Sequence, residues 1–271
     1  VGKHLARRSA DTLKKLSLEL GGNAPFIVFD DADVDAAVDG LMAAKFRNGG
    51  QTCVCPNRVF VQRGVFDTFA QKLAARVAAL KVGPASDPAS QIGPMINDRA
   101  VEKIERHVQD AVAKGAKVLA GGKRLPELGA TYYAPTVLSG ADARMACACE
   151  ETFGPVAPLT MFDNEDEVLQ AANDTPFGLA AYFYSQDVRR IWRVAEALES
   201  GIVGFRSAGA HHFMDVAWKR AFDSGQHLGP RLFAAGHFLT TTGGHFLTSG
   251  HALECDGPYG FVKAIREQIK N

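Results

Sequence analysis

The sequence lacks a net charge and any long apolar run. Its 271 residues include 30 Lys and Arg and 30 Asp and Glu, so no overall field attracts nucleic acid or an anionic membrane. No apolar stretch approaches the roughly 18–20 residues that a membrane-spanning helix needs. With 46% hydrophobic and 22% charged residues, the composition also argues against disorder. We therefore expect a globular protein with neither nucleic acid nor a membrane as its partner.

Cysteine is scarce, and the first residues lack the apolar core of a signal peptide. An odd number of cysteines without a secretion signal favours free thiols in a reducing compartment, so we expect a cytoplasmic protein. The second Cys-x-Cys pair has no other metal-binding residues near it in the sequence, so we expect two buried thiols there and no metal site. The five cysteines are Cys53, Cys55, Cys147, Cys149 and Cys255.

Short apolar runs alternate with amphipathic patterns up to residue 205. Phe26–Phe29 is typical of a buried parallel strand, and alternating leucines over residues 13–20 also indicate a strand. Asp33 is suited to cap a helix that runs toward Cys53. The alternation predicts an α/β domain with a mostly parallel sheet. The other expected strands are 59–62, 117–120, 179–184 and 201–205, and the other expected helices are 66–80, 101–112 with Gly115 as its cap, 165–173 and 188–198.

The composition changes after residue 205. Glycine becomes frequent, the hydrophobic period is lost, and only Phe261–Lys270 looks like a regular amphipathic helix. We place a junction near residues 204–207. Six of the eight histidines follow it, namely His211, His212, His227, His237, His245 and His251.

A candidate nucleophile lies in Asn48-Gly-Gly-Gln-Thr-Cys53-Val-Cys55. A thiolate adds readily to a carbonyl carbon, but an ordinary cysteine has a pKa of roughly 8.5 and needs surroundings that lower it or supply a base. Gly49 and Gly50 permit unusual backbone angles and leave N–H groups free for an oxyanion. Taken alone, the pattern is weak evidence, and a small buried structural cysteine fits it better.

Two further motifs change this interpretation. Leu-Ser-Leu-Glu19-Leu-Gly-Gly precedes the loop by 34 residues, and Glu150-Glu-Thr-Phe-Gly-Pro-Val156 follows it. Their order and spacing resemble those of the aldehyde dehydrogenase superfamily over residues 1–204. The resemblance implies that Cys53 is the nucleophile and that Glu19 activates water to hydrolyse a thioester on Cys53. A carboxylate that faces water at a strand end is the alternative for Glu19.

The resemblance also implies a coenzyme, NAD or NADP, and an aldehyde substrate. Glu151 would bind the nicotinamide ribose and Phe153 would pack near the nicotinamide, with Leu20 and Gly21 also at the coenzyme. The parent family forms homo-oligomers.

Arg47 and the Cys53-Val-Cys55 pair resemble the succinate-semialdehyde dehydrogenase branch. Arg47 would bind the distal carboxylate of a short semialdehyde through charge-assisted hydrogen bonds, and a surface arginine paired with a local acid is the alternative. Cys55 would form a reversible disulfide with Cys53, and a second small core residue is the alternative.

Both ends depart from the family pattern. Residues 1–22 look like the remnant of a coenzyme-binding domain and residues 23–204 like the catalytic domain, so we expect an aldehyde dehydrogenase-like fold that lacks most of its Rossmann-type domain and has doubtful activity alone. Residues 205–271 resemble an incomplete piece of a metal-dependent amidohydrolase, a TIM-type barrel. The chain therefore looks like a chimera, and an inactive fragment or a hydrolase activity of the tail are the alternatives. The segments of the tail that carry this resemblance are 215–225, 229–237, 242–245 and 256–270.

Overall fold

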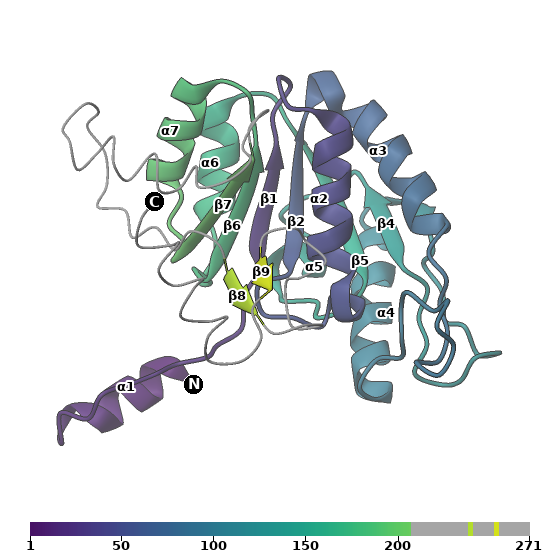
Figure 1. Cartoon of the computed structure of the whole chain (residues 1–271), viewed down its shortest axis with the longest axis horizontal. Coiled ribbons are helices and arrows are strands. Elements are labelled where there is room, and N and C mark those ends of the chain that lie inside the picture. The colour runs from purple at the N-terminus through teal and green to yellow at the C-terminus, as the bar shows by residue number, and fades with distance from the viewer. Residues whose placement is uncertain (207–237, 241–251, 255–271) are drawn as a thin grey trace. The chain divides into compact units, whose positions relative to one another are not determined.

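Figure 1 shows the computed structural model, which describes residues 1–206, 238–240 and 252–254. The chain divides into two compact units, Val1–Ser207 and Ala208–Asn271. In the second unit, β8 (Phe238–Thr240) pairs in parallel with β9 (Ala252–Glu254). The tail segments that resemble an amidohydrolase lie outside the described residues, so that resemblance stays a prediction.

The first unit is built on a seven-stranded sheet of order β3-β4-β5-β2-β1-β6-β7. Neighbouring strands are parallel except for β3 and β4, which are antiparallel at one edge. The predicted α/β fold with a mostly parallel sheet is confirmed. The strands are β1 (Ala24–Val28), β2 (Pro56–Gln62), β3 (Lys117–Ala120), β4 (Thr136–Ser139), β5 (Val156–Phe162), β6 (Ala180–Tyr184) and β7 (Ile202–Arg206).

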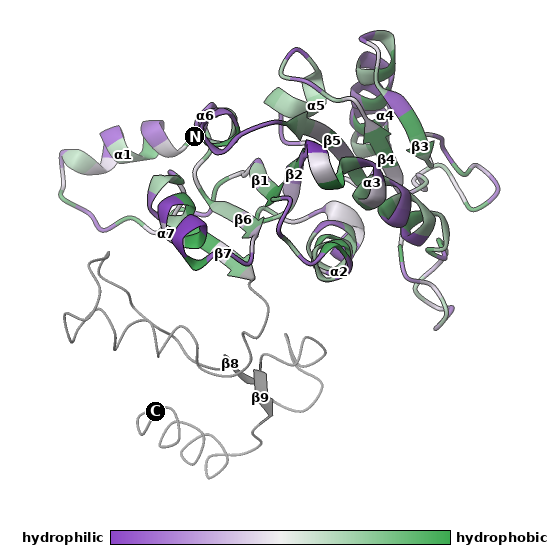
Figure 2. Ribbon diagram, turned by 90° about the horizontal axis from the view of Figure 1, so that it is seen from above, coloured by the Kyte–Doolittle hydropathy of each residue, from purple (hydrophilic) through white to green (hydrophobic). Residues whose placement is uncertain are grey.

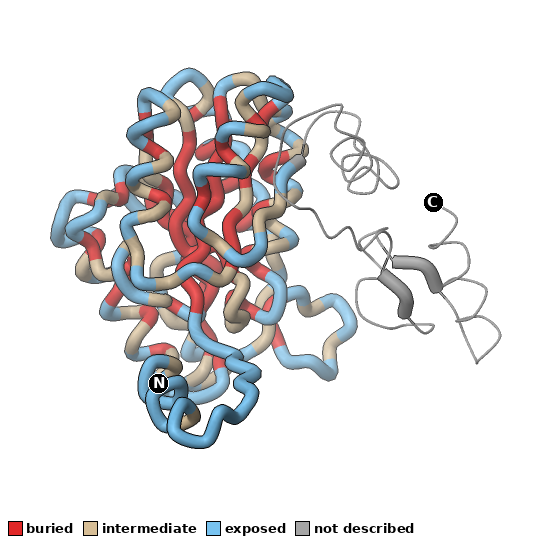
Figure 3. The backbone as a smooth tube through the Cα atoms, turned by 90° about the vertical axis from the view of Figure 1, so that its left-hand side faces the viewer, coloured by how far each residue is buried: buried red, intermediate tan, exposed pale blue. Residues whose placement is uncertain are grey.

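Helices cover both faces of this sheet (Figures 1 and 2). Alternate side chains of a strand point to opposite faces. Phe26 and Val28 therefore pack with α2 (Val34–Phe46) and α3 (Arg63–Ala78). Ile27 and Phe29 pack with α6 (Glu165–Asn173) and α7 (Val188–Ala197) on the other side. The central strands are buried along their length, as the red segments of Figure 3 show.

A further helix, α4 (Asp98–Ala113), builds a separate apolar cluster with β4 and with the short helix α5 (Ala146–Cys149). Two predicted helix ends are confirmed. Asp33 caps α2, because its carboxylate accepts a hydrogen bond from the Ala36 N–H at 3.1 Å. Gly115 follows α4 with φ of 105°, a conformation that glycine adopts readily.

The predicted strand over residues 13–20 is wrong. This segment has no regular structure and is exposed, and α1 (Gly2–Ala10) before it has no buried residue and projects away from the sheet (Figure 1). The leucines alternate, but they have no neighbouring strand in the described residues to pair with. Their exposed fractions run from 39% for Leu18 to 91% for Leu13.

Several elements were not predicted, among them α1, β4, α5 and β5 of the first unit. Strand β5 lies in the middle of the sheet although it contains Pro158, a residue that cannot donate to a ladder and that argues against a central strand in sequence. Strand β4 has only four residues, too few for a clear period. Within the described ranges, no helix is both long and apolar enough to cross a bilayer.

Candidate active site

The three motifs meet at the amino ends of neighbouring strands. Glu19 and its glycines lead into β1, Cys53 leads into β2, and Gly154-Pro155 leads into β5. In the sheet, β2 lies between β1 and β5, and Ala24 is paired with Pro56. The segments that precede these strands are therefore brought side by side, although they are far apart in the sequence.

The turn before Cys53 has an unusual backbone. Asn48, Gly49 and Gly50 all have positive φ, of 52°, 62° and 74°. Glycine adopts this region without strain and asparagine tolerates it better than most residues, so the unusual backbone angles predicted at Gly49 and Gly50 are confirmed. Gln51 fixes the turn, because Asn48 Nδ2 donates to its carbonyl at 3.0 Å and its own Nε2 donates to the Asn48 carbonyl at 3.1 Å.

Glycines allow the motifs to touch through their backbones. A Cβ at Gly22 would lie 2.2 Å from the carbonyl oxygen of Cys53, and a Cβ at Gly50 would lie 2.2 Å from that of Gly154. Real Cβ atoms do not approach oxygen so closely, so only glycine fits at either position without a backbone shift. Cys53 itself is half-buried and carries a free thiol.

Glu151 links the first and third motifs. Its Oε1 accepts a hydrogen bond from the Gly22 N–H at 2.8 Å. A Cβ at Gly21 would lie 3.1 Å from Oε2 of the same carboxylate, so glycine keeps that side of Glu151 open. A partly buried carboxylate beside an exposed backbone segment is an arrangement that can bind a hydroxyl group.

The residues around Glu151 are held by α4. Glu150 forms an ion pair with Arg106 at 2.7 Å, and Nδ1 of the buried His107 lies 3.1 Å from the Thr152 hydroxyl. Burial lowers the pKa of His107. Phe153 has a positive φ of 57° and is 37% exposed, so an aromatic ring is presented to solvent next to Glu151.

Cys55 lies in a buried polar cluster that sequence reasoning missed. Its thiol is free and fully buried, and Sγ donates to the carbonyl of Lys45 at 3.5 Å. Lys45 Nζ donates to Asn57 Oδ1 at 2.8 Å, and the Tyr182 hydroxyl donates to the Val54 carbonyl at 2.9 Å. Burial raises the pKa of Tyr182 to about 12. In the sequence, only the position of Lys45 on the apolar face of α2 indicated this cluster.

The remaining predicted site residues are exposed. Glu19 lies in the irregular segment before β1, and its Cα is at most about 11 Å from that of Gly22, since three peptide units join them. Leu20 and Arg47 are also exposed, and Leu20 lies against Gly2 of α1. The roles of Glu19, Leu20 and Arg47 stay predictions.

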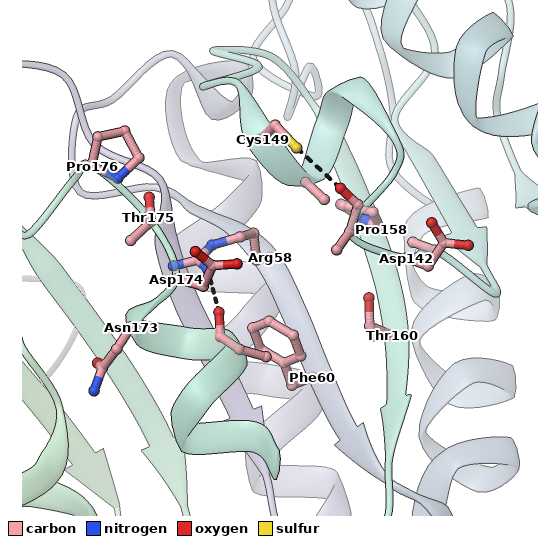
Figure 4. Close-up of a pocket in the computed structure, with 14 residues that line it drawn as sticks. Arg58, Phe60, Asp142, Cys149, Pro158, Thr160, Asn173, Asp174, Thr175 and Pro176 are labelled. Atoms are coloured by element: carbon pink, nitrogen blue, oxygen red, sulfur yellow. Dashed lines mark hydrogen bonds between the residues drawn. The ribbon is translucent and has the colours of Figure 1, made fainter.

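A cavity of about 480 Å³ lies beside this region, and its lining residues are shown in Figure 4. None of the predicted site residues lines it. On its floor, Arg58 donates to the carbonyls of Asn23, Ala171 and Ala172 at 2.8–2.9 Å, and burial lowers its pKa to about 10. Cys149 also lines the cavity and is exposed, so the expectation of two buried thiols holds only for Cys147. The described residues contain no group of three or more side chains that could hold a metal ion.

Together these features describe a three-layer α/β protein with a cysteine loop at the amino edge of its sheet. The chain belongs to the aldehyde dehydrogenase family, whose profile matches residues 1–215. It is 57% identical over 207 residues to a probable NADP(+) succinate-semialdehyde dehydrogenase of Sinorhizobium fredii. The matched region covers 76% of this chain and 42% of that protein. It is 55% identical over 208 residues to a 3-sulfolactaldehyde dehydrogenase of Pseudomonas putida, with 77% and 43% covered.

Solved structures agree with the sequence comparison. The crystal structure of succinate-semialdehyde dehydrogenase from Burkholderia pseudomallei matches with a TM-score of 0.73 at 58% identity, covering 78% of this chain and 43% of that one. The chain thus spans less than half the length of these relatives.

The close approach of Gly22 to Cys53 makes a direct prediction. In Gly22→Ala, the new methyl group must displace the Cys53 carbonyl, so we expect alkylation of Cys53 by iodoacetamide to slow by about 10- to 100-fold, as for small misplacements of a reacting group. Mass spectrometry of the labelled peptides separates Cys53 from the exposed Cys149. Gly201→Ala is the matched control, because its Cβ would meet nothing closer than 3.6 Å. An unchanged rate in Gly22→Ala would contradict the described approach.

The Glu150 ion pair makes a prediction about pH. The hydrogen bond from Arg106 lowers the pKa of Glu150 to about 2, below the unfolded value of roughly 4.3. Ionised Glu150 therefore stabilises the fold above about pH 4.3, and this contribution is lost as the pH falls toward 2. The side chain is 49% exposed, so Glu150→Gln should lower the free energy of unfolding by only about 1 kcal/mol or less at pH 7. Urea unfolding should show a smaller difference at pH 3, and equal differences at both pH values would refute the pairing.

Proposed function

We propose that this chain carries the catalytic part of an NAD(P)+-dependent dehydrogenase that oxidises a short anionic aldehyde, such as succinate semialdehyde, to the acid. The convergence of the Glu19, Cys53 and Glu151 motifs on the Gly22 backbone supports this most directly. Membership of the family and the activities in the names of its relatives agree with it.

The proposed chemistry begins at the Cys53 sulfur. As a thiolate, Cys53 adds to the aldehyde carbon and forms a thiohemiacetal, and loss of hydride from that carbon leaves an acyl thioester on Cys53. Glu19 takes a proton from water, which attacks the thioester carbon, releases the acid and restores the thiolate. The exposure of Glu19 gives it access to the water that this step consumes.

Residues at the same edge fit a nicotinamide coenzyme. NAD or NADP, when bound, accepts the hydride. Glu151 Oε2 lies beside Gly21 with no Cβ above it, which leaves room for a ribose hydroxyl, and Phe153 presents an exposed ring for packing. Leu20, which is 43% exposed, adds apolar surface.

Arg47 carries the proposal about the substrate. It opens the turn that leads to Cys53, and its side chain is exposed on that turn. A guanidinium group binds carboxylates and sulfonates through charge-assisted hydrogen bonds. Relatives named for succinate semialdehyde and for 3-sulfolactaldehyde both act on aldehydes with such an anionic group. We therefore place the distal anion of the substrate at Arg47.

The proposal extends to the organisation of the protein. We assign residues 1–22 to the end of a coenzyme-binding domain and residues 23–204 to the catalytic domain. The end of the first compact unit at Ser207 and the exposure of residues 11–21 support this division. The whole enzyme is proposed to be cytoplasmic and homo-oligomeric, as the free thiols and the family resemblance suggest.

Ester hydrolysis tests the nucleophile without coenzyme. With 4-nitrophenyl acetate, Cys53 is expected to release nitrophenolate in a burst as it becomes acylated, and Cys53→Ser should lose about 100-fold or more of the rate. Glu19→Gln should keep the burst but slow the steady state by about 100- to 10,000-fold, the usual contribution of a general base.

The exposed Cys149 provides the control for this assay. Cys149→Ser should leave both phases unchanged, because this thiol lies outside the proposed site. Equal rates in Cys53→Ser and the unchanged chain would overturn the proposed nucleophile, and a lost burst in Glu19→Gln would remove the water-activating role of Glu19.

The role of Arg47 is tested with two esters of similar size. Arg47→Gln should lower kcat/KM for the 4-nitrophenyl monoester of succinate by about 10- to 100-fold, the loss of a charge-assisted hydrogen bond worth about 1.5–3 kcal/mol. The uncharged 4-nitrophenyl butyrate should be cleaved as before. An equal fall for both esters would assign Arg47 to the shape of the turn, and no change for either would remove it from the site.

A further inference from the structure

Lys45 is an unusual residue in the core. It occupies the last turn of α2 and has no exposed surface. Its ammonium donates to Asn57 Oδ1 at 2.8 Å, and no carboxylate among residues 1–206 lies within ion-pair distance of it. Lysine is almost never fully buried without such a partner.

Burying this side chain costs stability. Removing an ammonium from water is expensive unless a nearby charge offsets it, and burial accordingly lowers the pKa of Lys45. Asn57 is also buried, and its Nδ2 has no hydrogen-bond partner in the described part of the chain. The link to Lys45 is thus the one side-chain hydrogen bond that Asn57 makes there. An apolar pair of similar size would avoid both costs.

The position of the pair in the chain suggests what it does. Lys45 stands immediately before the segment 46–54, which carries Cys53, and Asn57 stands just after it. The Lys45–Asn57 hydrogen bond therefore joins the two ends of this segment. The hydrogen bond from Cys55 Sγ to the Lys45 carbonyl joins them a second time. A Cβ at Gly50 would lie 3.2 Å from the same carbonyl, so the middle of the segment also rests on Lys45.

We propose that Lys45 is a positioning residue for Cys53, acting through its hydrogen bond to Asn57. This rests on the proposed role of Cys53 as the nucleophile. The hydrogen bond holds the start of β2 at a fixed distance from the end of α2. The left-handed turn between them is therefore restrained to one conformation. Without the bond, the two ends of the segment separate and the Cys53 sulfur moves relative to Gly22 and Glu151.

The experiment measures the burst with 4-nitrophenyl acetate in the full 271-residue chain. In Lys45→Met, which keeps the length of the side chain and removes its donor, the burst rate constant should fall by about 10- to 100-fold, because a small displacement of a nucleophile has that effect. The burst amplitude should remain that of the folded protein. If Lys45 only stabilised the fold, the burst amplitude would fall and the rate constant would not, since partial unfolding reduces the number of active molecules and leaves the folded ones unchanged.

A double-mutant cycle tests the link itself. Asn57→Leu breaks the same hydrogen bond from the other end, so it should slow the burst as Lys45→Met does, and the double variant should be no slower than either single variant. Val77→Ala, a core truncation in α3, is the control that lowers stability away from the segment and should leave the rate constant unchanged.

The possible outcomes are distinct. A wild-type rate constant in Lys45→Met, or multiplied effects in the double variant, would overturn the positioning role while the loss of the burst in Cys53→Ser still upheld the nucleophile. If Lys45→Met does not fold but Asn57→Leu does, the burst rate constant of Asn57→Leu tests the proposal: a slower burst supports the positioning role, and an unchanged burst overturns it. No burst in the unchanged chain would instead refute the proposed function.

Discussion

The arrangement of the site depends on one close contact between two backbones. Gly22 lies against the carbonyl of Cys53 so tightly that no side chain fits between them, and its N–H is bound by Glu151. This contact joins three segments that lead into β1, β2 and β5. Because the strands behind them are buried and hydrogen-bonded to one another, the segments cannot move apart without disturbing the sheet.

Buried and accessible residues have different roles at this edge of the sheet. The groups that fix the geometry have almost no exposed surface, as for Gly22, Lys45, Cys55 and Asn57. Among the groups proposed to meet coenzyme, substrate or water, Glu19 and Arg47 are exposed, and Cys53 and Glu151 are half-buried. A rigid frame with accessible side chains is what catalysis of this kind requires, since the nucleophile must be held in place while its partners come and go.

The polar groups of the frame carry an energetic cost that apolar packing offsets. Lys45 and Arg58 bring charges into the interior, where their ordinary pKa values cannot be maintained. Three clusters of buried apolar side chains form the core around the sheet. Arg58 donates to three backbone carbonyls, whereas Lys45 donates to the Asn57 side chain and lies near the thiol of Cys55, with no ion pair among residues 1–206. This difference is why Lys45, rather than Arg58, requires a functional explanation.

Periodicity and motif spacing predicted the α/β class and most helices and indicated Cys53 as the candidate nucleophile, because both are local properties of the chain. The sequence-based prediction was wrong for residues 13–20, whose leucines alternate as in a strand but have no partner strand in the described residues. It also missed β5, which forms within the sheet although it contains Pro158. The contact of Gly22 with Cys53 and the hydrogen bond of Lys45 to Asn57 are apparent only in the folded chain. Those contacts depend on which strands become neighbours, and no local pattern encodes that.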